Sequence, residues 1–296
     1  MKSSNFLLFI IPTLIWGSTW FIIKFQLGVT DPLLSVSYRF GIAGLLLLAY
    51  CVVFKLDLKF SKRSHLLMAL QGFFLFGFNY LFVYLSEKYL TSGLVAAAFS
   101  ILIFLNIFFA AIILKNKVRN RVVFGAILGV GGIVLIFKEE FITLDLSNDN
   151  FVGLLYCLVG ITLASLGNIT SAYNQRQKLP VIQTNMFGMI YGSLALLAVA
   201  ILSGSSFIFD SSWTYLLSLM YLAIMGSMVA FGAYLKLIGN IGPDKAAYVI
   251  LLTPIIALFI SNYFEGFQWT PYSVSGTILI VLGNLISLKK TKPRAS

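Results

Sequence analysis

Residues 114–123, LKNKVRNRVV, carry four cations between two long uncharged runs. The run before them covers residues 91–114, and the run after them covers residues 122–137. A helix needs roughly 20 apolar residues to cross the hydrocarbon core of a bilayer. The cations therefore mark a connection between two membrane spans. They raise the question of why one connection should hold so much positive charge.

The composition of the whole chain is typical of a membrane protein. Of its 296 residues, 59% are hydrophobic and 10% are charged, whereas a soluble domain has roughly 25% charged residues. The net charge of +11 does not indicate a nucleic-acid partner, because the charges form short clusters between long apolar stretches. We expect an all-α integral membrane protein with ten transmembrane helices. These candidate spans, of which the second is interrupted by Arg39, are 6–23, 33–54, 66–86, 91–114, 122–137, 151–175, 181–209, 211–235, 246–264 and 266–288.

Basic residues alternate between the two sides of this arrangement. Of the 21 Lys and Arg residues, 17 lie in one alternating set of connections and termini, and three lie in the other set. Cytoplasmic connections are enriched in Lys and Arg. We therefore predict a multi-pass protein of the plasma (inner) membrane with both termini in the cytoplasm. Membrane lipid is an expected partner, and residues 114–123 serve as a topology signal.

The chain also repeats at an offset of about 150 residues. Tyr84-Leu85 matches Tyr234-Leu235, and Ala96-Ala97 matches Ala246-Ala247. We predict five-helix repeats at 1–140 and 151–289, followed by a cytoplasmic tail at 290–296. An odd number of spans inverts the second copy. Accordingly, KNKVRNR in the first copy corresponds to EGFQWT (265–270) in the second, which has no cation.

Four motifs make the chain resemble the EamA-type branch of the drug/metabolite transporter superfamily. They are IWGSTW (15–20), DPLLSVSYRF (31–40), EKYLTSGLVAAAFS (87–100) and TPIIALFISNYFEGFQWTPYSVSGTILIVLGNLI (253–286). The first copy departs from the pattern, with Ile103-Phe104 at the place of Thr253-Pro254. The resemblance implies a central cavity lined by the first, third, fourth, sixth, eighth and ninth spans, and a tendency towards export. Members of this superfamily carry amino acids, sugars, nucleotide sugars or drugs.

Polar and aromatic residues deep in those spans are candidates for binding a substrate, because polar groups facing lipid are costly. An amide could instead form an interhelical hydrogen bond, and a Trp could be an interfacial anchor. The candidates are Trp16, Trp20, Asn79, Tyr80, Asn106, Ser165, Asn168, Tyr248 and Thr253.

Two further residues are expected to act in structure or gating. Arg39 is the one formal charge well inside a span, and it could snorkel outward, pair with Asp31 or attract an anion. Pro254 would release the carbonyl group near Ile250, as a hinge, a kink or a polar lining. No Asp or Glu lies in the middle of a span, so we do not expect a proton relay built on a midplane carboxylate.

We predict a secondary transporter that moves a small polar metabolite, such as an amino acid, by alternating access, with efflux as the direction. The candidate lining lacks a cation cluster for phosphates, so neutral or zwitterionic cargo is favoured. Multidrug or cation efflux is an alternative, as is a channel or scaffold. An enzyme is not expected, because neither H-E-x-x-H nor G-x-S-x-G occurs. We expect no cofactor or metal, and either a monomer or a homodimer.

Overall fold

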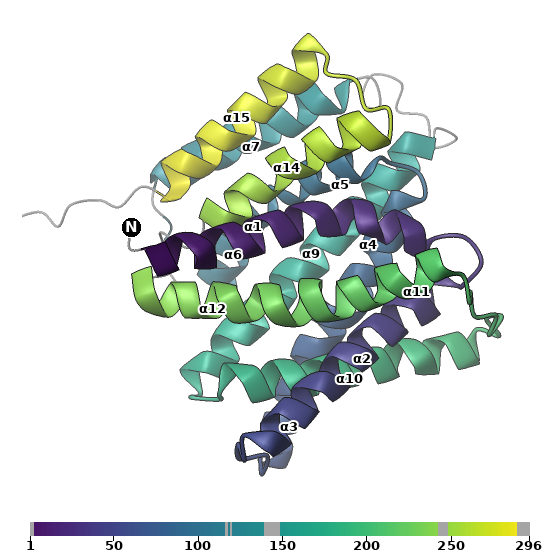
Figure 1. Ribbon diagram of the computed structural model, residues 1–296. Coiled ribbons are helices and arrows are strands. Elements are labelled where there is room, and N and C mark those ends of the chain that lie inside the picture. The colour runs from purple at the N-terminus through teal and green to yellow at the C-terminus, as the bar shows by residue number, and fades with distance from the viewer. Residues whose placement is uncertain (1–2, 116–117, 119, 139–148, 242–247, 289–296) are drawn as a thin grey trace, which may run out of the picture.

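The computed structural model describes residues 3–115, 118, 120–138, 149–241 and 248–288, and these form ten helical rods (Figure 1). Seven rods are long and apolar enough to cross a membrane, and α7, α14 and α15 are shorter apolar helices. The predicted all-α fold with ten spans is therefore confirmed. The continuous rods are α1 (Ser3–Ile23), α2 (Pro32–Val53), α7 (Asn120–Ile136), α9 (Asp149–Arg176), α10 (Val181–Leu202), α14 (Tyr248–Phe264) and α15 (Pro271–Leu288).

Three rods are built from shorter pieces. The third rod joins α3 (Lys62–Gln71), the π-helix η2 (Gly72–Phe78) and α4 (Asn79–Glu87). The fourth joins α5 (Ser92–Phe99) and α6 (Leu102–Ile113), and the eighth joins α11 (Trp213–Met220), the π-helix η3 (Tyr221–Val229) and α12 (Ala230–Ile241). A short 3₁₀ turn, η1 (Lys24–Gln26), follows α1.

The two π-helices are direct evidence of the inverted repeat. A shift of 150 residues, the offset of the sequence matches, carries Gly72–Phe78 onto a segment within Tyr221–Val229. The π-helix is a rare form that usually appears as a local bulge within an α-helix. Each half thus contains a π-helical segment at the same level of its third rod, although the two rods run in opposite directions through the bundle.

The halves meet through close backbone contacts along α7 and α15, which lie side by side at the upper edge of Figure 1. A Cβ atom placed on Gly132 would lie 2.5 Å from the carbonyl oxygen of Gly276, and the reciprocal distance is also 2.5 Å. Gly125 and Gly283 show the same reciprocity at 2.4 Å. Only glycine permits such an approach. Gly125 and Gly132 of the first copy match Gly276 and Gly283 of the second copy in the sequence repeat. The two copies therefore touch at glycines that repeat in the sequence.

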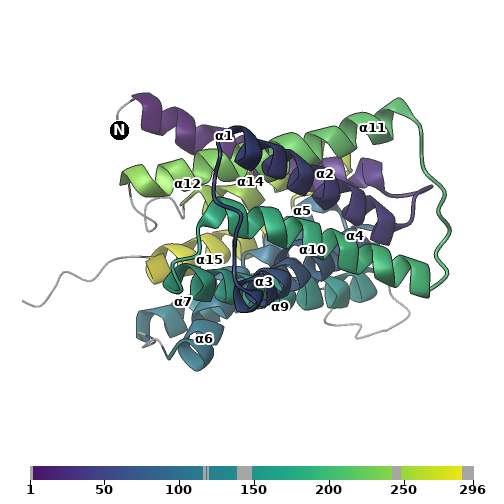
Figure 2. The ribbon, with the colours of Figure 1, turned by 90° about the horizontal axis from the view of Figure 1, so that it is seen from below.

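A second reciprocal contact joins α2 to α10. The Ser37 hydroxyl donates to the Ser193 carbonyl at 3.0 Å, and the Ser193 hydroxyl donates to the Ser37 carbonyl at 2.7 Å. Together these bonds satisfy two buried hydroxyl groups across the junction of the halves. Between the two paired edges, α1 lies beside α12, as both Figure 1 and Figure 2 show.

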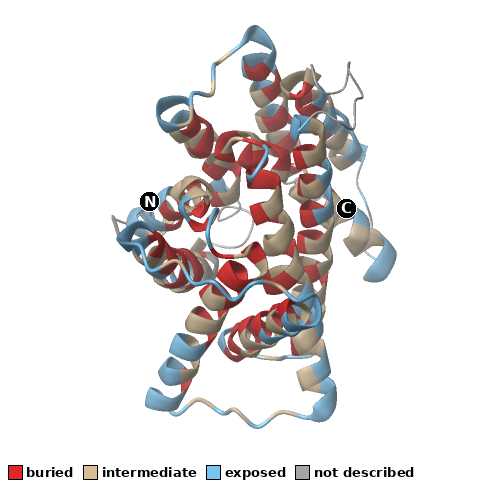
Figure 3. Ribbon diagram, turned by 90° about the vertical axis from the view of Figure 1, so that its right-hand side faces the viewer, coloured by how far each residue is buried: buried red, intermediate tan, exposed pale blue. Residues whose placement is uncertain are grey.

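The outer surface of the bundle suits a lipid environment. Large apolar side chains are exposed there, including Leu45 (61% exposed), Val53 (72%) and Ile127 (64%). Figure 3 shows the buried residues turned inward and the exposed ones at the periphery. In water, exposed apolar area on this scale would drive association, whereas lipid tails cover it at no cost.

Local sequence signals fix several helix ends. The carboxylate of Asp31 accepts a hydrogen bond from the Leu33 amide at 2.8 Å, and Pro32 takes the first helical position of α2. Ser212 caps α11 in the same way. These are favoured N-cap arrangements. Both caps lie at the end of the bundle away from the start of α1, which we call the opposite face; the end where α1 starts is the N-terminal face.

Candidate functional site

A cavity of about 240 Å³ lies inside the bundle at the middle depth of the helices. It is lined by the six rods that the family resemblance implies, and α15 adds Asn284. Among the described residues that line it, none is charged. The lining residues are Trp16, Thr19, Trp20, Ile23, Leu75, Phe76, Asn79, Tyr80, Val83, Ala96, Phe99, Ser100, Leu102, Ile103, Ala164, Asn168, Phe231, Tyr234, Ile250, Thr253, Pro254 and Asn284.

Aromatic rings form one wall of this central cavity. The ring of Trp16 packs edge-on against Phe231 and Tyr234, with centroids 5.0 and 5.2 Å apart. Trp20 packs against Phe99 at 4.9 Å. Such tilted pairs hold large rings in fixed positions. The wall therefore offers a rigid apolar surface to a bound molecule.

The position of Trp16 depends on the π-helix η3. Its indole nitrogen donates a hydrogen bond to the carbonyl oxygen of Gly226, within η3, at 3.0 Å. A π-helical turn changes the regular pairing of the helix and can free carbonyl groups for outside donors. This bond ties the first helix of one half to the eighth helix of the other. The position of Trp16 therefore depends on how the two halves are placed relative to each other.

Amide side chains supply the polar groups of the cavity. Asn79 donates to the Leu75 carbonyl at 3.1 Å, and its own Oδ1 atom has no hydrogen-bond partner among the described residues. Oδ1 of Asn284, in α15, is also buried and has no hydrogen-bond partner among the described residues. Buried amide oxygens normally accept a hydrogen bond. Two residues of the lining therefore each hold a buried acceptor oxygen that is unpaired among the described residues.

The predicted binding residues divide into two groups. Trp16, Trp20, Asn79, Tyr80, Asn168 and Thr253 line the central cavity. Three others do not: Asn106 accepts a hydrogen bond from Asn168 at 3.4 Å, Ser165 is fully buried, and Tyr248 is 37% exposed near the start of α14. For Asn106 the structure thus matches the alternative reading of an interhelical hydrogen bond.

Arg39 lies behind the cavity wall. It is buried at 2% exposure, and its guanidinium carbon lies 4.5 Å from the ring centroid of Tyr80 and 5.1 Å from that of Phe40. The charge is directed inward and stacks on aromatic faces, which favours a cation by roughly 0.5–2 kcal/mol. Asp31, its possible partner, instead caps α2.

Pro254 lines the cavity without interrupting α14, which continues to Phe264. A proline removes the hydrogen bond to the carbonyl four residues earlier, here that of Ile250. The Thr253 hydroxyl donates to this carbonyl at 3.0 Å. The released carbonyl is therefore satisfied by the neighbouring side chain.

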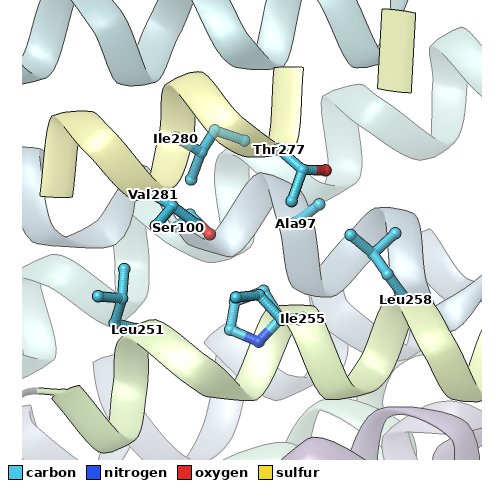
Figure 4. A pocket seen from close by; sticks show the side chains of 9 residues that line it. Ala97, Ser100, Leu251, Ile255, Leu258, Thr277, Ile280 and Val281 are labelled. Atoms are coloured by element: carbon cyan, nitrogen blue, oxygen red, sulfur yellow. The ribbon is translucent and has the colours of Figure 1, made fainter. Parts of the chain in front are cut away.

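Two other hollows border the site. Behind Ser100 and Pro254 lies a gap of about 10 Å³ between α5, α14 and α15 (Figure 4). It has room for about one water molecule, so it is packing space and not a metabolite site. A groove of about 470 Å³ runs between α2, α10 and the η3–α12 rod. Phe231 lines both this groove and the central cavity, and so stands between them.

A polar latch joins four helix ends at the opposite face. Lys24, after α1, donates hydrogen bonds to the carbonyl groups of Glu87 (2.5 Å) and Leu90 (2.7 Å). Its ammonium group also lies 3.7 Å from a carboxylate oxygen of Glu265, in the turn after α14. Glu265 in turn accepts hydrogen bonds from the amide and the hydroxyl of Ser92, at the start of α5. The latch (Lys24, Ser92 and Glu265) links the ends of α1, α4, α5 and α14 at this face of the bundle.

Comparison with known proteins agrees with this architecture. The profile of the EamA-like transporter family matches residues 3–138 and 151–289, one copy in each half. The chain therefore belongs to the EamA-like transporter family, within the drug/metabolite transporter superfamily. It is a membrane transporter and not an enzyme.

Relatives cover nearly the whole chain. An uncharacterized inner membrane transporter, YedA of Escherichia coli K12, is 26% identical over 92% of this chain and 89% of its own length. An uncharacterized transporter, YoaV of Bacillus subtilis, is 26% identical over 93% and 90%. Protein PagO of Salmonella typhimurium is 23% identical over 97% and 93%. A solved crystal structure shares the fold, with a TM-score of 0.68, 17% identity and coverage of 97% and 98%.

Some lining residues were not predicted from the sequence. Asn284 lies in the tenth span, outside the expected set, and Phe99 and Phe231 look like ordinary apolar residues there. Tyr234 was noticeable in the sequence, because it matches Tyr84 at the repeat offset of about 150 residues. The sequence carries no signal for Phe99 and Phe231, because phenylalanine occurs both in the lining and on the exposed surface, as at Phe108 and Phe124.

Proposed function

We propose that this transporter moves a small polar metabolite, an amino acid or a related compound, across the membrane by alternating access. The observation that carries the proposal is the central cavity of about 240 Å³, with contributions from both halves. Cavities of this kind at a repeat interface suit alternating access, because rocking one half against the other exposes the same site to either side.

The lining chemistry supports neutral or zwitterionic cargo. Asn79, Asn168 and Asn284 bring amides to the cavity, and aromatic rings surround them. A phosphate would require Arg or Lys groups in the lining, and the described lining has none. The unpartnered Oδ1 atoms of Asn79 and Asn284 suit the ammonium or amide donors of an amino acid.

We further propose that the N-terminal face is cytoplasmic and that the cargo leaves the cell. The support for this orientation is the bias of Lys and Arg towards the connections on that side. With this orientation, the latch closes the outer side. The resemblance to the family favours efflux, and the arrangement of the helices is compatible with transport in either direction.

Efflux of flat cationic drugs is the alternative within transport. The aromatic wall of Trp16, Trp20 and Phe99 could stack on a planar cation. A carboxylate in the lining would strengthen such binding, and the described lining residues include none. This difference in charge is the reason for preferring the metabolite.

The test is flux in proteoliposomes loaded with radiolabelled amino acids. We expect saturable flux and trans-stimulation, and a loss in Trp16→Ala and Asn79→Ala. The control is Leu45→Ala on the lipid-facing surface, where Leu45 is 61% exposed. Absence of flux for every small metabolite, with folded protein in the vesicles, would refute the proposal.

A further inference from the structure

Glu87, the last residue of α4, is a buried acid without a partner. Its side chain is 0% exposed, and neither carboxylate oxygen has a hydrogen-bond partner among the described residues. In the sequence it looks like one of several acids at the ends of spans. In the structure it is enclosed between the latch and the central cavity.

Its place on α4 connects Glu87 to the cavity. Val83 lies one helical turn earlier, and Tyr80 lies two turns earlier; both line the cavity. Residues four and seven apart share one face of a helix. Glu87 therefore continues the lining stripe of α4 towards the opposite face.

Lys24 donates no hydrogen bond to the carboxylate of this acid, although it is hydrogen-bonded to the main chain of the same residue. A Lys ammonium group has three donors. Two of them go to the main-chain oxygens of Glu87 and Leu90, and the remaining side faces Glu265 at 3.7 Å. The ammonium group of Lys24 thus lies near both acids, but its ion pair is with Glu265 and none of its hydrogen bonds goes to the Glu87 carboxylate.

The other titratable and charged groups around Glu87 come from every neighbouring element. Arg39 is on α2, Cys157 is on α9, Tyr84 is on α4 itself, and Lys24 and Glu265 belong to the latch. Arg39 is occupied with the rings of Tyr80 and Phe40, and its Nε and Nη1 atoms have no hydrogen-bond partner in the described chain. The cluster therefore contains an acid and a guanidinium that are both buried and not bonded to each other.

An ionised carboxylate in this position would be very costly. A buried charge without hydrogen bonds costs several kcal/mol or more, so a buried acid takes up a proton instead. We propose that Glu87 is a proton-binding site that couples transport to a proton gradient, with the form described here carrying the proton. The inference rests on the proposed function, and it names the coupling ion for the same cavity.

The exchange step is a simple ionisation. The O–H bond of the Glu87 carboxylic acid breaks, the proton passes to water in the cavity, and the carboxylate takes up the free donors of Arg39. Protonation from the opposite face, when the latch is open, reverses this step and releases Arg39. One proton thus crosses the bundle for each cycle in which cargo moves the other way, so the proton gradient drives efflux.

The first test needs no substrate. Infrared spectra of the purified protein in lipid at neutral pH should contain the carbonyl stretch of a protonated carboxylic acid, and Glu87→Gln should lack it. Asp210→Asn is the matched control, because Asp210 is an acid at the same face whose carboxylate accepts a hydrogen bond from the Ser212 amide; it should keep the band. Absence of the band in the unmodified protein, or its persistence in Glu87→Gln, would overturn the inference.

The second test uses proteoliposomes with a pool of radiolabelled amino acids and a pH-sensitive dye inside. The unmodified protein should accumulate amino acid against its gradient when a proton gradient is imposed. Glu87→Gln should lose this accumulation while exchange of label at equal pH persists, and Asp210→Asn should retain both. No flux at all in the unmodified protein contradicts the proposed function. Flux that ignores the proton gradient, or gradient-driven flux in Glu87→Gln, contradicts the proton site alone.

Discussion

In the fourth helix of each half, the regular backbone hydrogen bonding is disturbed at the same level, but the cause differs between the two halves. In the first half the rod is broken between α5 and α6, at Ser100 and Ile101. In the second half α14 is continuous and contains Pro254, which releases the carbonyl of Ile250. Ile250 lies 150 residues after Ser100, so both irregularities occupy the same level of the repeat.

The half without proline is the one that breaks. At Ser100 and Ile101 the amides bond to the carbonyls three residues earlier, at 3.0 and 3.1 Å, which tightens the turn. At Pro254 the Thr253 hydroxyl takes the released carbonyl, so the helix continues. A proline alone therefore does not predict where a membrane helix ends. Both irregularities border the cavity, and discontinuous helices are a common feature of transporter binding sites.

The largest effect is expected where the two halves touch. Gly132→Leu would force a side chain into the carbonyl of Gly276, which lies 2.5 Å from the Cβ position. Overpacking of this kind costs about 3 kcal/mol, and we expect a lower melting temperature in detergent and less folded protein in the membrane. Gly131→Leu is the control, since a Cβ at Gly131 has no neighbour within 4 Å. Equal melting temperatures for the two variants would refute the contact.

The next effect concerns the latch, which joins the fourth helices at the opposite face. Glu265→Ala removes the acceptor of the Ser92 amide and the partner of Lys24. Hydrogen bonds to a charged group contribute about 1.5–3 kcal/mol, so the opposite face should open more often. Labelling of a cysteine placed at Ala96 by a membrane-impermeant maleimide should become on the order of tenfold faster or more.

The control for the latch is Asp210→Ala, an acid on the same face whose carboxylate only accepts a hydrogen bond from the Ser212 amide. It should leave the labelling rate unchanged. If Glu265→Ala labels no faster than this control, the latch does not hold the opposite face closed.

A smaller effect is expected from Pro254→Ala. The alanine amide can bond to the Ile250 carbonyl and make α14 more regular, and one such hydrogen bond should raise the stability by about 1 kcal/mol. Transport should become slower, because the second half loses its weakened point. Pro271→Ala is the comparison variant, since Pro271 begins α15 and has no helical carbonyl to release. Faster transport in Pro254→Ala would contradict a role for the irregular turn.

The smallest effect belongs to Thr253. Thr253→Val removes the hydroxyl bonded to Ile250 while keeping the shape of the side chain. Interhelical and backbone hydrogen bonds of side chains in membranes contribute about 0.6 kcal/mol on average. The melting temperature of Thr253→Val should be lower by a small but measurable amount. That of Thr253→Ser, which keeps the hydroxyl, should be lowered less. A valine variant as stable as the original would show that the released carbonyl needs no donor.

The number and direction of the helices could be predicted from the sequence because both depend on patterns along the chain. Charge-free stretches delimit the spans, and the contrast of residues 115–121 with 265–270 reveals the inversion. The limits 1–140, 151–289 and 290–296 stay predictions, and the tail 290–296 lies entirely outside the described residues. The π-helices η2 and η3 could not be predicted, because their turns contain ordinary apolar residues.

The site was harder to predict, because depth in a span does not fix which way a side chain faces. Ser165 and Asn168 lie on neighbouring turns of α9, yet only Asn168 lines the cavity. Glu87 was the larger omission. Its position at the end of a span suggests exposure, and its burial depends on Lys24 and Glu265, which come from distant parts of the chain.

The paired π-helices also bear on the history of the chain. A π-helical turn holds one more residue than the α-helical turn it replaces, so it records an insertion. Such insertions at equivalent positions of both copies, in η2 and η3, are explained most simply by a single event. A half-length ancestor would then have carried the extra residue before its gene was duplicated, and the broken α5–α6 rod and Pro254 would be later, separate changes.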